Sequence, residues 1–188
     1  MASVEASGRA SEEYYHRAMR ITVLGDSGKS CFITQALSNA GRMTLLDGGG
    51  PPDADGWRRS TCLLSPVGSE EEVIKLTIME CGHDYSRYSH QIDHLMKASP
   101  ITILVVPSKD TMPSAGRWLD RIIAASADLP TRPKVTTVVL HESDTPLTGD
   151  GPVEHFIDSL LPGTPVLNCD PTDPRSALKA LQSIIHPS

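Results

Sequence analysis

The chain has 188 residues, of which 39% are hydrophobic, enough to build the core of one ordinary globular domain and to argue against global disorder. It carries 17 basic against 23 acidic side chains, so its net charge of -6 gives no reason to expect a nucleic-acid partner. Only 4% of the residues are aromatic, so Val, Ile and Leu must fill the core, as in aliphatic α/β proteins.

Residues 1–17 are small and polar, which predicts a flexible N-terminal extension before a single domain over residues 18–188. From Met19 onward, apolar runs of strand length alternate with amphipathic segments, the pattern of βαβ units and a largely parallel sheet. Six strands are predicted, at residues 21–24, 60–64, 73–79, 101–106, 135–140 and 165–168. Helices are predicted to begin near Lys29, Tyr85, Ser114, Pro152 and Pro174.

The lengths of the connections between these strands predict whether neighbouring strands run parallel or antiparallel. The segment between the second and third strands is too short for a crossover helix, which predicts one antiparallel hairpin in an otherwise parallel sheet. The last helix has a clear start, because Asp173 can cap its free amides and Pro174 suits the first helical position. Residues 47–57 are rich in Gly and Pro and predict a long mobile loop.

The segment Gly25-Asp26-Ser27-Gly28-Lys29-Ser30 directly follows the first strand and opens the first helix. A turn of backbone amides at a helix N-terminus binds phosphate oxygens, Lys29 would reach the β- and γ-phosphates, and the Ser30 hydroxyl would ligate Mg²⁺. Two residues instead of four separate the glycines, so fewer amides face the phosphates and we expect reduced affinity. The alternative is a plain strand-to-helix turn in which both glycines supply only permissive backbone.

The stretch VLGDSGKSCFI resembles the opening of a Ras-superfamily small GTPase with two residues deleted, and the element order from Met19 to Ile185 is similar to that fold. The resemblance implies a six-stranded, mostly parallel sheet with helices on both faces, and GTP or GDP with Mg²⁺ as cofactors. It also implies that nucleotide contacts come from Asp26, Ser27, Gly28, Lys29, Ser30 and Cys31.

The segment after the third predicted strand reads Glu80-Cys81-Gly82-His83. By the same resemblance, Glu80 stands in for the Asp that holds Mg²⁺ together with Ser30, and the Gly82 amide senses the γ-phosphate. His83 falls at the position of the Gln that orients the attacking water, and its ring is a poor substitute, so we expect slow hydrolysis or none. The alternative reading of Glu80 and His83 is solvated loop polarity.

The base-reading motif of the family corresponds to His141-Glu142-Ser143-Asp144. Asp144 would accept two hydrogen bonds from guanine, a pattern that adenine lacks. His141 replaces the family's Asn, so guanine preference is expected to be weakened, and a lone Asp is also a common turn former. After the sixth strand, Cys169 and Asp170 occupy the place where backbone amides cover the base.

The loop before Ser60 lies where the family has its first switch, yet the sequence offers no certain switch threonine; Ser60 and Thr61 are the nearest hydroxyls. The neighbouring Trp57-Arg58-Arg59 has two readings. It is either an exposed partner-binding spot, because Trp and Arg are enriched in binding hot spots, or one buried Trp beside two solvated arginines.

The combination of a degenerate Glu-Cys-Gly-His segment, a defective base motif and no lipidation cysteine resembles the Rab-like small GTPase subunits of the intraflagellar transport B complex. This implies a subunit that docks on coiled-coil proteins of the cilium or flagellum. The four cysteines lack metal spacing and no apolar leader is evident, so we expect a cytoplasmic protein with no direct membrane anchor. The alternatives are a nucleotide-free scaffold and a P-loop small-molecule kinase, the latter lacking a recognisable basic lid.

Overall fold

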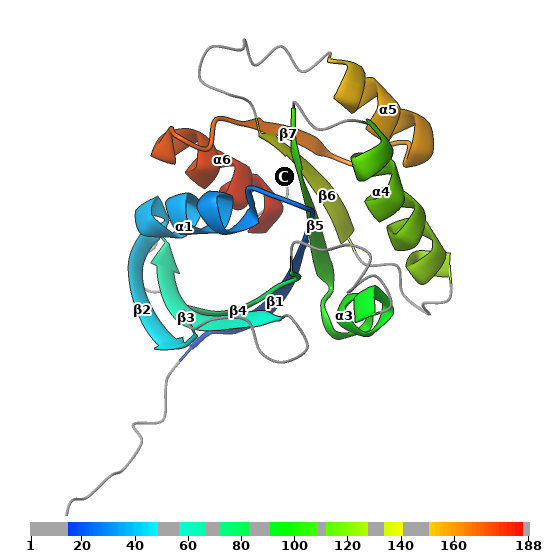
Figure 1. Cartoon of the computed structure of the whole chain (residues 1–188). Coiled ribbons are helices and arrows are strands. Elements are labelled where there is room, and N and C mark those ends of the chain that lie inside the picture. Colours follow the sequence, from blue (N-terminus) through cyan, green and yellow to red (C-terminus); the bar gives the residue numbers. More distant parts are fainter. Residues whose placement is uncertain are drawn as a thin grey trace, which may run out of the picture.

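The computed structural model describes residues 15–48, 57–66, 72–82, 91–108, 112–127, 134–140 and 151–185. In this part of the chain, seven strands form one sheet and amphipathic segments form five helices that cover both of its faces (Figure 1). The strands are β1 (Arg17–Leu24), β2 (Gly41–Asp47), β3 (Arg58–Pro66), β4 (Ile74–Glu80), β5 (Ile101–Pro107), β6 (Lys134–Leu140) and β7 (Val166–Cys169). The helices are α1 (Lys29–Asn39), α3 (Ile92–Ala98), α4 (Met112–Ala127), α5 (Pro152–Leu160) and α6 (Pro174–Ile185).

The sheet has the strand order β2-β3-β4-β1-β5-β6-β7. β1 pairs in parallel with β4 on one side and β5 on the other, and β5, β6 and β7 continue in parallel. β3 runs antiparallel to β4, which confirms the predicted hairpin. The prediction of a mostly parallel α/β sheet is therefore confirmed, in an arrangement compatible with a P-loop GTPase-like fold.

The predicted number of strands is wrong: the sequence predicts six strands, and the described residues contain seven. The missed strand is β2, which pairs antiparallel with β3 at the edge of the sheet and adds a second antiparallel pairing. Most residues of β2 are exposed, including Met43 and Leu45. Such a strand buries no continuous apolar face, so its residues show neither the unbroken apolar run nor the strict alternation that reveals a strand in a sequence.

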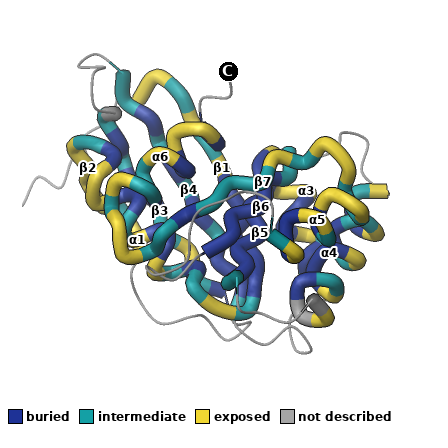
Figure 2. The backbone as a smooth tube through the Cα atoms, turned by 90° about the horizontal axis from the view of Figure 1, so that it is seen from above, coloured by how far each residue is buried: buried dark blue, intermediate teal, exposed yellow. Residues whose placement is uncertain are grey.

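Two apolar layers hold the domain together, one on each face of the sheet. Alternate residues of β1 illustrate the division, since Ile21 and Val23 join the layer under α1 and α6, whereas Leu24 joins the layer under α3, α4 and α5. Figure 2 shows the central strands as the most buried part of the backbone, with the exposed residues on the outer sides of the helices. This burial fixes the ends of β1, β4, β5 and β6 as a rigid platform.

The helix starts agree closely with the sequence. α1, α5 and α6 begin at Lys29, Pro152 and Pro174 as predicted, and α4 begins two residues before Ser114. The predicted cap of α6 is confirmed, because the backbone N–H of Arg175 donates to Asp173 Oδ1 at 3.0 Å. The helix start expected near Tyr85 lies outside the described residues.

The predicted N-terminal extension and the Gly/Pro-rich loop lie mostly outside the described residues. β1 begins at Arg17, one residue before the predicted domain boundary, while most of the N-terminal extension and residues 49–56 of the Gly/Pro-rich loop lie outside the described residues. Among the helices that the structure describes, none combines the length and apolar character that a bilayer crossing requires.

Candidate functional site

The phosphate-loop candidate lies at the carboxyl end of the central strand β1, between β1 and the first turn of α1. The chain after β1 builds one half of the sheet, through β2, β3 and β4, and then crosses to the other side of β1 to build β5, β6 and β7. In open α/β sheets, ligands bind outside the carboxyl ends of the strands at such a point of reversal. The loop is therefore in the position where this architecture places a ligand.

Two glycines give this loop its shape. Gly25 has φ 128° and Gly28, the residue before α1, has φ 79°, both in the region that L-residues with a Cβ avoid. A Cβ on Gly25 would lie 2.2 Å from the carbonyl oxygen of Val105, and one on Gly28 would lie 2.2 Å from Leu140 Cδ1. The loop thus sits directly on the ends of β5 and β6. Only glycine fits at position 25, where the neighbour is backbone, whereas at Gly28 the positive φ favours glycine.

Lys29 is the first residue of α1, and only 1% of its surface is exposed. Its ammonium donates a hydrogen bond to the carbonyl of Gly25, at the other end of the loop. Among the described residues, no carboxylate forms an ion pair with it. Burial lowers the pKa of Lys29, while Cys81, Glu80 and Asp26 raise it by smaller amounts. A buried cation with one neutral acceptor is a site that an anion would complete.

The side chain of Asp26 is held by α4, a helix on the face of the sheet opposite to α1. The indole N–H of Trp118, in α4, donates to Asp26 Oδ1 at 2.9 Å, and Arg117 lies 3.9 Å from Oδ2. The side chain of Asp26 therefore anchors the loop to α4, whereas the neighbouring Ser27 is exposed at the loop. The sequence did not predict a role for Trp118. The one feature that pointed to it is that the chain has only two tryptophans among few aromatic residues.

Ser30 and Glu80, the two predicted Mg²⁺ ligands, are brought together as expected. The Ser30 hydroxyl donates to Glu80 Oε1 at 2.8 Å. Arg58, at the start of β3, completes the cluster: its Nη1 donates to Ser30 Oγ at 3.2 Å and lies 3.9 Å from Glu80 Oε2. In this arrangement the residues do not fit Mg²⁺, because the Ser30 hydroxyl and Glu80 Oε1 are hydrogen-bonded to each other and a cationic side chain, that of Arg58, lies beside both.

The segment Trp57-Arg58-Arg59 follows neither reading completely. Trp57 is buried, with 8% of its surface exposed, in the apolar layer that contains α3 and α4, so it is not an exposed hot spot. Arg59 is exposed as the second reading expected. Arg58, by contrast, reaches the loop region. Thr61 is a buried residue within β3, which excludes it as a mobile switch hydroxyl.

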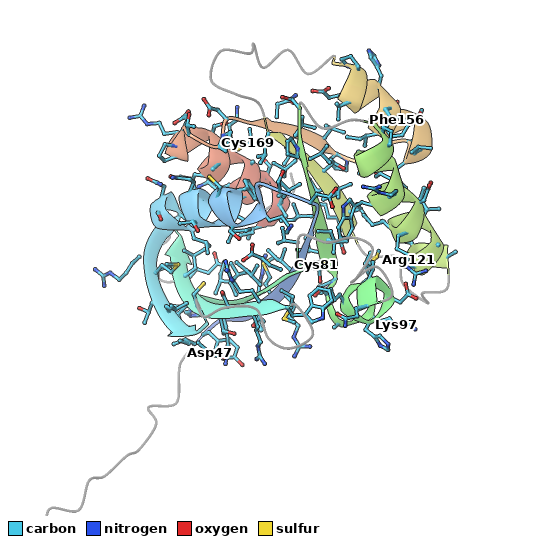
Figure 3. The ribbon with its side chains drawn as sticks, viewed as in Figure 1. Asp47, Cys81, Lys97, Arg121, Phe156 and Cys169 are labelled. Atoms are coloured by element: carbon cyan, nitrogen blue, oxygen red, sulfur yellow. The ribbon has the colours of Figure 1, made fainter. Side chains whose placement is uncertain are left out.

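Cys81 and Gly82 directly follow the end of β4, beside β1. The backbone N–H of Cys81 donates to the carbonyl of Val23 at 3.1 Å, which fixes the chain against β1. Its thiol is buried close to the central strands (Figure 3), and this burial raises its pKa to about 12. Gly82 is partly exposed, and it is the last described residue before the segment that contains His83.

The predicted base-covering residues lie beside the loop, but their polar groups have other partners. The thiol of Cys31 donates to the carbonyl of Pro171 at 3.8 Å, so the start of α1 adjoins the chain after β7. Cys169 is fully buried in the layer under α1 and α6 (Figure 3), and burial raises its pKa to about 11. The backbone N–H of Asp170 donates to Ser176 Oγ at 3.1 Å, and its carboxylate accepts from Thr172.

Three predicted site residues, His83, His141 and Asp144, lie outside the described residues. A cavity of about 180 Å³ adjoins the cluster of Ser30, Arg58 and Glu80. It lies between α1, β2 and β3, and Met43 and Leu45 contribute to its lining.

Comparison of the chain with protein-family models and with curated proteins finds no match. The fold and the loop at the end of β1 define an α/β protein with a glycine-containing strand-to-helix turn, an arrangement compatible with a P-loop GTPase-like fold.

Proposed function

We propose that this protein is an atypical small GTPase, one that binds GTP or GDP at the loop from Gly25 to Ser30. The observation that carries the proposal is the Lys29 ammonium, almost fully buried at the head of α1 with a backbone carbonyl as its bonded acceptor. Burying a lone cation is costly, and a phosphate oxygen would supply the missing charge. The amides of the turn and the dipole of an 11-residue helix favour the same ligand.

The preference for guanine is supported by the family resemblance. Asp144 would read the base, with His141 beside it, and the adjacent chain after Cys169 would cover it. The contact between Cys31 and Pro171 supports this placement, because it brings that chain next to the phosphate loop.

Slow hydrolysis or none is the proposed catalytic behaviour. His83 replaces the glutamine that orients water, and a single imidazole lacks the paired donor and acceptor of an amide. The protein would then act as a subunit of an assembly. The resemblance to the Rab-like subunits of intraflagellar transport supports coiled-coil partners in the cilium or flagellum.

Nucleotide content tests the proposal directly. Protein purified without added nucleotide is denatured, and the supernatant is analysed by chromatography for GDP or GTP that the protein has retained. Calorimetry on the emptied protein then compares GDP with ADP, and the Asp144→Ala variant is expected to lose the difference between them. If the protein retains no nucleotide and also binds none in the titration, the proposal is contradicted. An unchanged preference for GDP over ADP in Asp144→Ala would show that the base is read elsewhere.

A nucleotide-free scaffold is the second candidate function, and one observation favours it. Met43 and Leu45 are exposed on β2, whose outer side pairs with no strand of the described residues and so offers backbone groups to a partner strand. The same nucleotide analysis separates the two functions. For the scaffold, cross-linking should place a partner on β2 with the loop empty.

A further inference from the structure

Arg58 has the place and the chemistry of a fixed cation beside the phosphate loop. We propose that its guanidinium supplies the positive charge at this site in place of a divalent metal, so that nucleotide binding by this chain does not require Mg²⁺. The inference rests on the proposed function, nucleotide binding at the loop, and specifies how that site handles phosphate charge.

The contacts of Arg58 are those that a bound cation would otherwise make. Nη1 of Arg58 lies 3.2 Å from the Ser30 hydroxyl oxygen and 3.9 Å from Glu80 Oε2, while Ser30 and Glu80 are joined by a 2.8 Å hydrogen bond. Mg²⁺ requires near-octahedral oxygen ligands at about 2.0 to 2.1 Å and keeps several of its waters. The Ser30 hydroxyl and Glu80 Oε1 are hydrogen-bonded to each other, and the charge of Glu80 is balanced by Arg58, which lies 3.9 Å from Oε2.

The strand register places Arg58 there. Arg58 and Glu80 are direct partners in the antiparallel pairing of β3 with β4, so their Cα positions are fixed opposite each other. Ser30 belongs to the first turn of α1, which the loop holds above the end of β1. The arginine is thus positioned by the sheet itself, with 35% of its side chain exposed and the carboxylate of Glu80 only 9% exposed.

The remaining donors of Arg58 suit a phosphate ligand. Its Nε atom is buried and has no hydrogen-bond partner among the described residues. A guanidinium presents five N–H donors in a planar fork that matches phosphate geometry, and it stays charged at every physiological pH. Together with Lys29, it gives the site two cations beside the one carboxylate of Glu80, so a dication added there would meet repulsion as well as attraction.

The adjacent residue provides a matched control. Arg59 is exposed, and its Cα partner in β4 is Met79, an uncharged residue. Arg59→Ala therefore removes the same formal charge from the same strand without touching Ser30 or Glu80.

The test measures GDP and GTP affinity of the full chain by calorimetry, once with excess Mg²⁺ and once with excess EDTA. For the unaltered protein we expect affinities that agree within about threefold in the two buffers, whereas loss of a charge-assisted contact in Arg58→Ala weakens binding in EDTA by roughly tenfold or more. In that variant no arginine competes with a metal at Ser30 and Glu80, so added Mg²⁺ should restore part of the affinity. Arg59→Ala is expected to behave as the unaltered protein does.

The results of this test distinguish failure of the inference about Arg58 from failure of the proposed nucleotide binding. Nucleotide binding that weakens by about tenfold or more in EDTA for the unaltered protein would overturn the inference while leaving the proposed function intact. An Arg58→Ala variant that binds as tightly as Arg59→Ala would also overturn it. Absence of nucleotide binding in both buffers would overturn the proposed function and this inference together. Arg58→Lys, which keeps the charge, provides the comparison if Arg58→Ala does not fold; it should retain binding in EDTA.

Discussion

The indole of Trp118 and the carboxylate of Asp26 join two elements that lie on opposite sides of the central sheet. Trp118 is 1% exposed in α4, and its N–H lies 2.9 Å from an oxygen of Asp26 in the loop before α1. The loop is therefore tied to α4 by its second residue, to the ends of β5 and β6 by its two glycines, and to itself by Lys29. Such anchoring would preorganise the short loop for the nucleotide that we propose it binds.

Replacing Trp118 by Phe removes the hydrogen bond while keeping most of the buried ring. We expect the free energy of unfolding to fall by about 1.5 kcal/mol, since the bond has a charged acceptor and part of the ring volume is also lost. Nucleotide affinity should fall as well, because the loop is less ordered. Denaturant unfolding and calorimetry measure both. As a control, Arg117→Ala should cost less than about 0.5 kcal/mol, because that ion pair is exposed.

Lys29→Met should have opposite effects on stability and on binding. It removes a buried charge and keeps a chain of similar length, so the empty protein should unfold with an unchanged or slightly higher free energy, by up to about 1 kcal/mol. Nucleotide affinity should decrease by about 1.5 to 3 kcal/mol. Lys97→Met, on exposed α3 surface, should change neither quantity. Strong destabilisation by Lys29→Met would instead identify Lys29 as a purely structural clip of the loop.

Gly25→Ala should destabilise the protein more than Gly163→Ala does. Both glycines have positive φ, at 128° and 75°; alanine at Gly163 bears the cost of a left-handed conformation, about 1 to 2 kcal/mol, and the φ of Gly25 lies beyond that region and is less favourable still. Only at Gly25 does the new Cβ meet backbone, the carbonyl of Val105, whereas nothing lies within 4 Å at Gly163. The difference between the two unfolding free energies reports the contact with β5 together with the more unfavourable φ of Gly25. Equal losses would show that the loop moves freely away from β5.

Thiol labelling should distinguish one cysteine from the other three. Cys31 is exposed, while Cys62, Cys81 and Cys169 are buried and their pKa values are raised to about 11, 12 and 11. At about pH 8 we expect one adduct on the folded protein, at Cys31, and four after denaturation, because the thiolate is the reactive form. Mass spectrometry counts the adducts. Rapid labelling of a second site in the folded protein would contradict the buried positions.

Alkaline pH should lower the free energy of unfolding. The unfolded thiols ionise near 9.0, whereas in the folded protein Cys62 and Cys169 keep their protons up to about 11. Between these two values the unfolded state binds fewer protons, so stability is lost as the pH rises, by at most about 1.4 kcal/mol per pH unit for each thiol.

The lowered pKa of Lys29 acts in the opposite direction, since there the unfolded state binds more protons. Denaturant unfolding is therefore measured across this pH range in the Lys29→Met background, with Cys62→Ala as the comparison, whose slope should be smaller. Equal slopes for the two proteins would contradict the burial of the Cys62 thiol.

The sequence by itself determined the parallel α/β framework and the loop, for reasons that are local along the chain. Buried strands such as Ile101–Pro107 are continuous apolar runs, and the starts of α1 and α6 carry glycine, proline and a capping Asp that act within a few residues. The edge strand β2 escaped because its exposed residues follow no apolar pattern.

The tertiary structure alone decided which side chains complete the loop. Trp118 lies 92 residues from Asp26, and Arg58 lies 28 residues from Ser30, and no periodicity along the chain links either pair. The first contact depends on how α4 packs on the sheet, and the second on the register of β3 against β4. Pairings of this kind are set by packing and strand register, which arise only when distant segments bury their apolar faces together.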